Sequence, residues 1–406
     1  MKNKLSPLSL RWLYLAVGGI ALLFIGVIYA WSIFKVPLAV SFGWTDAQLA
    51  FAYTLTMSFF CIGSLASGAL VKRIPLWSVF CLSAALILGG YIWTVNLTGS
   101  IYALYLAYSV MIGGGIGLSY NTIVALGNAW FPDKKGTCSG IMMMCFGFST
   151  MVIGNLAARF FDLPEVGWKK TFLVLGVVIT LILVLCALVL RAPGKEVALP
   201  AAKPTRGRKE DFEPRDYSAR EMLCRVSFWI CYVYGTLHAA VGSAMFNFAR
   251  DVILDFGATA ALATTLVGVL SVCNGLGRVL CGLAFDHLGR KTAMQLSNII
   301  TVLSPGLMLV ALATGSLPLA IVAVCLAGLS YGTSPTISST LTISFYGARD
   351  FAMNYSVSNT KLLFASFAAT ATSALFAATG TYFAPFALLF GFALGAFVLN
   401  FFIRKP

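Results

Sequence analysis

The chain contains V-C-N-G-L-G-R-V-L-C-G-L-A-F-D-H-L-G-R-K at residues 272–291, a segment of unusual composition. Its first part is apolar enough to cross a bilayer, yet it carries the charge of Arg278. A second cation of this kind, Lys361, lies in N-Y-S-V-S-N-T-K-L-L-F-A-S, residues 354–366. An arginine or lysine at the centre of a spanning helix costs roughly 2.5–3.5 kcal/mol, so it usually faces a water-filled cavity or a counter-ion. Neither cation has an acidic residue close by in sequence, so no local counter-ion is available.

The two cations lie at the same predicted depth. Arg278 is 12 residues before Arg290, and Lys361 is 12 residues after Arg349. At 1.5 Å per helical residue, each is about 18 Å from the cytoplasmic interface, within a hydrocarbon core about 30 Å thick. We therefore expect both to face one site. The alternative is that each reaches an interface or bonds to backbone carbonyls.

The composition is that of a polytopic membrane protein. Of the 406 residues, 59% are hydrophobic and only 10% are charged, against about 25% charged in soluble domains. The net charge of +14 comes from short loops between apolar spans, so we expect no nucleic-acid partner. The ten cysteines fall mostly in apolar spans as small packing residues, and only two histidines are present. We therefore expect neither a metal site nor a cofactor.

Apolar runs predict an all-α protein of twelve transmembrane helices with both termini cytoplasmic. On that topology 21 of the 28 Lys and Arg residues lie on the cytoplasmic side, as the positive-inside rule requires. We expect a multi-pass protein of an inner or plasma membrane. The expected spans are about 12–36, 47–71, 76–96, 100–130, 136–160, 168–190, 227–249, 259–285, 292–313, 316–346, 351–378 and 382–403.

The chain divides into two similar halves. A polar segment rich in Pro and charge, residues 192–226, has the composition of a cytoplasmic linker between six-span halves at 1–191 and 227–406. G-L-S-Y occurs at 117–120 and again at 328–331. Parallel halves with a site near the midplane between them are typical of major-facilitator transporters.

Several motifs resemble one family in particular. G-L-A-F-D-H-L-G-R-K at 282–291 resembles the loop motif of the major facilitator superfamily, although its counterpart at 68–77, G-A-L-V-K-R-I-P-L-W, lacks the acidic residue. Further segments look like the oxalate/formate antiporter family, which is related to monocarboxylate carriers: Y-A-W-S-I-F at 29–34, N-A-W-F-P-D-K-K-G at 128–136, N-G-L-G-R at 274–278 and the Lys361 segment. The acidic-glycine signature of monocarboxylate carriers is absent from the first span.

The resemblance implies roles for several residues. It implies that Arg278 and Lys361 bind substrate carboxylates, and that a cavity is lined by Tyr29, Tyr120 and Tyr331. The chain departs from the oxalate carrier where that protein has a glutamine and two tryptophans, at Ile28, Ala327 and Ser358. An aromatic cage for small planar oxalate is therefore partly missing, which leaves room for a larger or more hydroxylated substrate.

The residues themselves also favour an anion site. Arg278 offers a planar fork for a carboxylate, whereas Lys361 is a compact point charge. Asn274 and Ser358 lie one helical turn before these cations, where each could donate to a ligand oxygen. The tyrosines could complete the site or simply pack between helices. We expect a structural, conformational role for the loop residues Gly282, Asp286, Gly289 and Arg290.

The expected function is exchange of small organic carboxylates by a secondary transporter that works as a monomer. The alternatives are a proton-coupled monocarboxylate symporter, which would need a titrating group such as His238, and a transporter-fold carboxylate sensor. His238 also fits a packing role in the seventh span. No nucleophile–base pair or phosphate-binding loop is evident, so we do not expect an enzyme.

Overall fold

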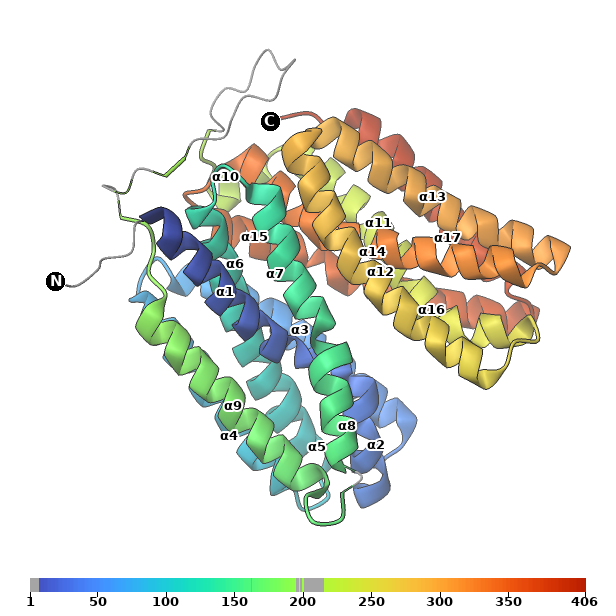
Figure 1. The fold of residues 1–406 in the computed structure, drawn as a ribbon, viewed down its shortest axis with the longest axis horizontal. Coiled ribbons are helices and arrows are strands. Elements are labelled where there is room, and N and C mark those ends of the chain that lie inside the picture. Colours follow the sequence, from blue (N-terminus) through green and yellow to red (C-terminus); the bar gives the residue numbers. More distant parts are fainter. Residues whose placement is uncertain (1–6, 162, 195–196, 198, 201–214) are drawn as a thin grey trace. The chain divides into compact units, whose positions relative to one another are not determined.

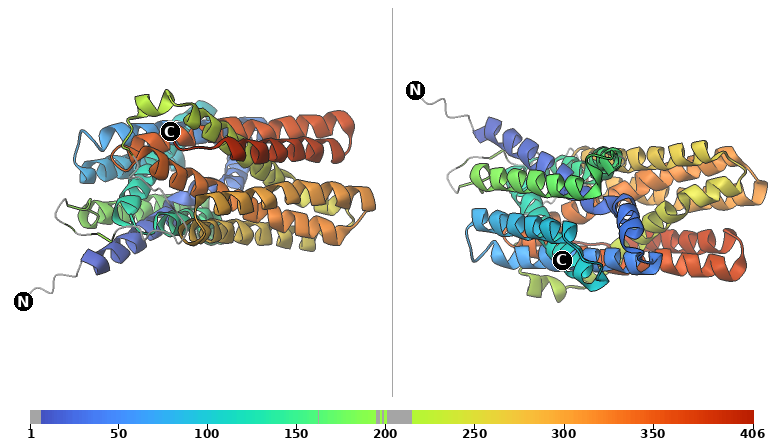
Figure 2. Two further views of the ribbon diagram at one scale, coloured as in Figure 1. Left: turned by 90° about the horizontal axis from the view of Figure 1, so that it is seen from above. Right: turned by 90° about the horizontal axis from the view of Figure 1, so that it is seen from below.

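The computed structural model describes residues 7–161, 163–194, 197, 199–200 and 215–406, and every element within these ranges is a helix (Figures 1 and 2). In the first part of the chain the helices are α1 (Pro7–Ile25), η1 (Gly26–Ala30), α2 (Trp31–Phe42), α3 (Asp46–Leu70), α4 (Leu76–Val95), α5 (Ile101–Leu104), η2 (Tyr105–Gly113), α6 (Gly114–Trp130), α7 (Lys135–Ser149), η3 (Thr150–Gly154), α8 (Asn155–Phe161) and α9 (Gly167–Val189). The second part holds α10 (Ala219–Leu223), α11 (Val226–Asp255), α12 (Ala260–His287), α13 (Arg290–Thr314), α14 (Leu317–Tyr346), α15 (Phe351–Asn359), α16 (Lys361–Thr379) and α17 (Phe383–Phe402).

The helices confirm the all-α membrane fold. Within the described residues, 11 helical stretches are long and apolar enough to cross a bilayer. The expected seventh span corresponds to α11, which has 30 residues but is not among those 11. Its polar side chains, among them Thr236, His238 and Ser243, lower its hydropathy.

Two expected spans are interrupted. The first, expected at 12–36, changes to a tighter 3₁₀ turn at Gly26–Ala30, where a Cβ on Gly26 would lie 2.2 Å from the Phe146 carbonyl oxygen. Backbones approach this closely only at glycine. The eleventh, expected at 351–378, breaks at Thr360, so that Lys361 begins α16. Hydropathy alone gave no sign of either break.

The chain forms two compact units, which we call unit 1 and unit 2. Unit 1 comprises residues 1–133, 145–202 and 350–357, and unit 2 comprises 134–144, 203–349 and 358–406. The expected halves at 1–191 and 227–406 remain a prediction. The centre of the expected linker, 201–214, lies outside the described residues.

A close helix crossing with the same glycine pattern occurs in each unit. In unit 1, α3 packs on α6, and a Cβ on Gly63 would lie 2.1 Å from the Gly114 oxygen. In unit 2, α12 packs on α14, and a Cβ on Gly277 would lie 2.2 Å from the Leu329 oxygen. Gly63 and Gly277 are 214 positions apart. The crossing in unit 2 brings the Arg278 turn of α12 against α14.

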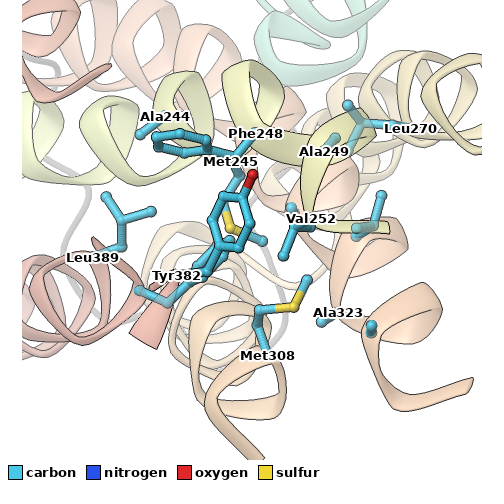
Figure 3. Close-up of a cluster of buried hydrophobic side chains, with 14 of the residues drawn as sticks. Ala244, Met245, Phe248, Ala249, Val252, Leu270, Met308, Ala323, Tyr382 and Leu389 are labelled. Carbon is cyan, nitrogen blue, oxygen red and sulfur yellow. The ribbon is translucent and has the colours of Figure 1, made fainter. Parts of the chain in front are cut away.

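The core of unit 2 is packed by small side chains around a few large ones (Figure 3). Alanines such as Ala244 and Ala249 let the helices approach, while Phe248 and Tyr382 fill the space between them with ring centroids 5.7 Å apart. Because lipid is as apolar as these side chains, close packing rather than water exclusion holds membrane helices together. This core fixes α11 against α17, and therefore fixes the helix that faces Lys361.

Candidate anion site

Arg278 lies on α12 with 5% of its surface exposed. Its Nε donates to Asn274 Oδ1 at 3.1 Å, and its guanidinium also donates to the Met143 carbonyl oxygen of α7. Asn274 lies one helical turn before Arg278, as expected. Its side-chain oxygen accepts a hydrogen bond from the arginine, so this oxygen orients Arg278. Both acceptors are neutral, so they orient the guanidinium and leave its positive charge in place.

Lys361 is the first residue of α16 and is also 5% exposed. Its ammonium lies against the backbone of α11, where a Cβ on Gly235 would be 2.8 Å from Nζ. Within the described part of the chain, no acid lies within ion-pair distance of this lysine. The positive end of the α16 dipole adds to the charge of Lys361, so this position favours an anion.

A cavity of about 30 Å³ opens beside Lys361. This volume exceeds the about 10–15 Å³ that one water requires, so a small polar group fits. All of its lining residues belong to unit 2. Besides Lys361 they include side chains that can donate hydrogen bonds, namely Tyr232, His238, Ser334, Ser338, Thr342 and Ser358.

Only some of the expected site residues of unit 2 line this cavity. Ser358 lines the cavity with Lys361, and Thr342 donates to its hydroxyl at 3.4 Å. Arg278 is not among the lining residues. Tyr331 packs on α11, where a Cβ on Gly242 would lie 2.3 Å from its ring and where the Phe246 ring centroid is 5.3 Å away.

Tyr29 and Tyr120 belong to unit 1, where they join an aromatic cluster. The Phe146 ring lies between them, with centroid distances of 5.3 Å to Tyr29 and 4.7 Å to Tyr120. The Tyr120 hydroxyl is 3.0 Å from that of Tyr355. Sequence reasoning missed Phe146 and Tyr355. Tyr355 could have been noticed, because it lies six residues before Lys361 in the same quoted stretch.

The loop motif binds the N-terminal end of α7. The Asp286 carboxylate accepts from Gly136 N at 2.9 Å, from Thr137 N at 2.7 Å and from Thr137 Oγ1 at 2.6 Å. These backbone donors have no partner within their own helix, so a carboxylate there satisfies them and complements the helix dipole. Gly282 allows the approach, since a Cβ on it would lie 2.2 Å from the Gly136 oxygen.

The rest of the motif has contacts of a different kind. Gly289 has φ +81° at the start of α13, a conformation that favours glycine. The Arg290 guanidinium lies 5.0 Å from the Phe345 ring centroid and donates to the Ile403 oxygen at 3.4 Å. Asp286 thus holds α7, while Arg290 contacts the C-terminal ends of α14 and α17.

We expect Gly235→Ala to weaken anion binding without preventing folding. The new Cβ would meet the flexible end of Lys361, so the ammonium must move while the backbone can stay. We expect affinity to fall about tenfold to a hundredfold, because a charged hydrogen bond contributes about 1.5–3 kcal/mol. The affinity is measured from the rise in melting temperature of the purified protein as oxalate or formate is added. Gly391→Ala is the matched control, since nothing lies within 4 Å of that position, and equal affinity in both variants would contradict the placement of Lys361.

Comparisons with known proteins agree with this architecture. The profile of the Major Facilitator Superfamily matches residues 16–251. The oxalate:formate antiporter of Oxalobacter formigenes is 26% identical over 369 residues, covering 87% of this chain and 83% of that protein. Human monocarboxylate transporter 12 is 25% identical over 375 residues, covering 84% of this chain and 70% of that protein.

Solved structures show the same fold. The Escherichia coli fucose:proton symporter has a TM-score of 0.71 to this chain at 14% identity, with 98% of this chain and all of that chain covered. At that identity the likeness concerns the fold alone. Because the family profile covers more than half of the sequence, this chain belongs to the major facilitator superfamily, whose members are membrane transporters rather than enzymes.

Proposed function

We propose that this transporter exchanges small organic carboxylates by alternating access. The observation that carries the proposal is the burial of two cations, Arg278 and Lys361, in one unit, each only 5% exposed. Neither takes part in an ion pair with another described residue. A buried charge without a partner costs several kcal/mol, so an anionic cargo would stabilise the protein by neutralising it.

The chemistry of the site supports a carboxylate. A guanidinium presents parallel donors that match the two oxygens of a carboxylate, and Asn274 holds the Arg278 guanidinium in a fixed orientation. Hydroxyl groups around Lys361 supply further donors. The names of the similar proteins, an oxalate:formate antiporter and a monocarboxylate transporter, support the same substrate class.

Reconstitution tests this proposal. Liposomes containing the protein are preloaded with oxalate, formate, pyruvate or a hydroxylated dicarboxylate, and uptake of each labelled carboxylate is measured. We expect at least one pair to exchange, and we expect neutral sugars of similar size to be ignored. Uptake of sugars in preference to every carboxylate would refute the proposal.

Proton-coupled symport of a monocarboxylate is the second candidate. It is favoured by the position of His238, a titratable group that lines the same cavity as Lys361. An inward proton gradient distinguishes the two mechanisms. Under symport it would accelerate uptake into vesicles without internal substrate, whereas under exchange such vesicles stay inactive.

We expect Lys361→Gln to impair dianions more than monoanions. With two cations in unit 2, a dicarboxylate can neutralise both charges, whereas a monocarboxylate neutralises one. The variant should therefore lose affinity for oxalate by a larger factor than for formate, as measured by competition against labelled uptake. Lys169→Gln removes an equal charge from an exposed position and serves as the control. Equal losses for both anions would show that Lys361 does not sense the second charge.

The distribution of basic residues supports cytoplasmic termini, a linker at 192–226 and two six-span halves. The contacts of Asp286 with α7 and of Arg290 with the ends of α14 and α17 support a conformational role for the loop motif. We also propose that the protein works as a monomer, as a complete site within one chain requires no second copy.

A further inference from the structure

His238 is buried on α11 among hydroxyl groups of two other helices. It is 1% exposed. Its Nε2 lies 3.0 Å from Ser297 Oγ and 2.9 Å from Thr301 Oγ1, both on α13, and 3.4 Å from Thr333 Oγ1 on α14. Because buried polar groups are normally hydrogen-bonded, these hydroxyl groups satisfy one ring nitrogen of His238 and leave the other to be explained.

The hydroxyl cluster can satisfy Nε2 as an acceptor. Thr301 donates to the Ser297 carbonyl oxygen at 2.8 Å, and Thr333 Oγ1 lies 2.5 Å from Ser297 Oγ and can donate to it. Ser330 Oγ lies 2.6 Å from Thr301 Oγ1 and can donate to it. The hydroxyl hydrogen of Ser297 is then available for Nε2. In this arrangement the neutral imidazole carries its proton on Nδ1.

That Nδ1 atom has no hydrogen-bond partner within the described residues, although it is fully buried. A buried donor without an acceptor costs about 1–3 kcal/mol. The same residue lines the cavity beside Lys361. Gly235, against which the Lys361 ammonium lies, precedes His238 by one turn of α11, a rise of about 4.5 Å. The residue that carries this unsatisfied donor therefore lines the same cavity as the Lys361 ammonium, which has no acidic partner among the described residues.

We propose that His238 is a substrate-binding residue whose Nδ1–H donates to the anion held by Lys361. The inference rests on the proposed function, because it takes that anion to be a carboxylate. Ser297 and Thr301 act as positioning residues, since they hold the ring through Nε2 and so direct Nδ1 away from the cluster. The ligand class is a small carboxylate, one oxygen of which accepts from Nδ1 while another contacts the ammonium.

Two substitutions separate this role from a purely structural one. The amide of asparagine can occupy the place of Nδ1, and the amide of glutamine can reach the place of Nε2. His238→Asn therefore keeps the group that would contact the ligand and loses the contacts to Ser297 and Thr301. His238→Gln keeps the contacts to Ser297 and Thr301 and loses the group that would contact the ligand. If Nε2 only stabilises the fold, glutamine replaces histidine well and asparagine does not.

The measurement is the melting temperature of the purified full-length protein in detergent, titrated with oxalate and with formate, since a ligand that binds the native state raises this temperature. We expect His238→Asn to melt at a lower temperature than the wild type yet to keep its oxalate affinity within about threefold. We expect His238→Gln to melt near the wild type and to bind oxalate about tenfold more weakly or worse. His287, exposed at the end of α12, is the matched control, and neither His287→Asn nor His287→Gln should alter affinity.

The outcomes distinguish this inference from the proposed function. Oxalate and formate binding by His238→Gln at wild-type affinity would overturn the role of Nδ1 while leaving carboxylate exchange intact. Absence of stabilisation of the wild type by either anion, together with absence of exchange in liposomes, would overturn both. If His238→Asn is the less stable variant but binds oxalate more tightly than His238→Gln, the result supports His238 as a substrate-binding residue.

Discussion

Replacing Arg278 with Ala or Gln is expected to abolish carboxylate uptake while leaving the protein inserted and folded. Arg278 is buried, and Asn274 and the Met143 carbonyl orient it through neutral contacts. Its charge is therefore available to a ligand. Loss of one partner of a buried, hydrogen-bonded charge pair costs about 2–5 kcal/mol. At 1.36 kcal/mol per factor of ten, uptake should fall by about 30-fold to several thousandfold.

Arg278→Lys should fail almost as completely. A lysine carries the same charge, but its point-like ammonium cannot hold Asn274 and present two parallel donors to a carboxylate together. Initial rates of counterflow in proteoliposomes measure the effect, and Arg250→Gln, which removes a cation from an exposed position, is the control. Near-normal affinity and rate in Arg278→Gln would refute the anion site.

Uptake is also expected to require a carboxylate on the opposite side of the membrane. In the empty carrier, the ammonium of Lys361 lies in a cavity without an acidic partner among the described residues. A cation at the centre of a spanning helix costs about 2.5–3.5 kcal/mol, and closing the empty site would carry a penalty of this size. Arg278 adds less to this barrier, because the structure supplies it with two neutral acceptors. The loaded carrier avoids most of this penalty.

The expected consequence is that the empty carrier reorients about a hundredfold more slowly than the loaded one, since 1.36 kcal/mol on a barrier changes a rate tenfold. Initial uptake of labelled carboxylate is compared in empty and preloaded liposomes at matched pH and clamped membrane potential. Lys361→Gln provides an internal check, because removal of the charge should narrow the difference between the two vesicle types. Equal rates in empty and preloaded vesicles would argue against obligatory exchange.

Properties that depend on local composition could be predicted before the fold was known. Hydropathy predicted the helical spans, because about 20 apolar residues in a row are stable only within a bilayer or a protein core. The same pattern revealed Arg278 and Lys361, since a lone cation contrasts with the apolar residues around it. Motif resemblance at 282–291 predicted the superfamily, which the profile match confirmed.

The groups that those cations contact depend on the tertiary fold. Arg278 donates to the carbonyl oxygen of Met143, which lies 135 positions earlier in the sequence. Lys361 lies against Gly235 because glycine has no side chain to occupy that space. The interruptions at Gly26–Ala30 and Thr360 follow no hydropathy signal. His238 could be read from the sequence as a packing residue or a titrating one. Its unsatisfied Nδ1 and its place beside Lys361 depend on where α13 and α14 put their hydroxyl groups, and such close approaches between distant segments are invisible in a local pattern.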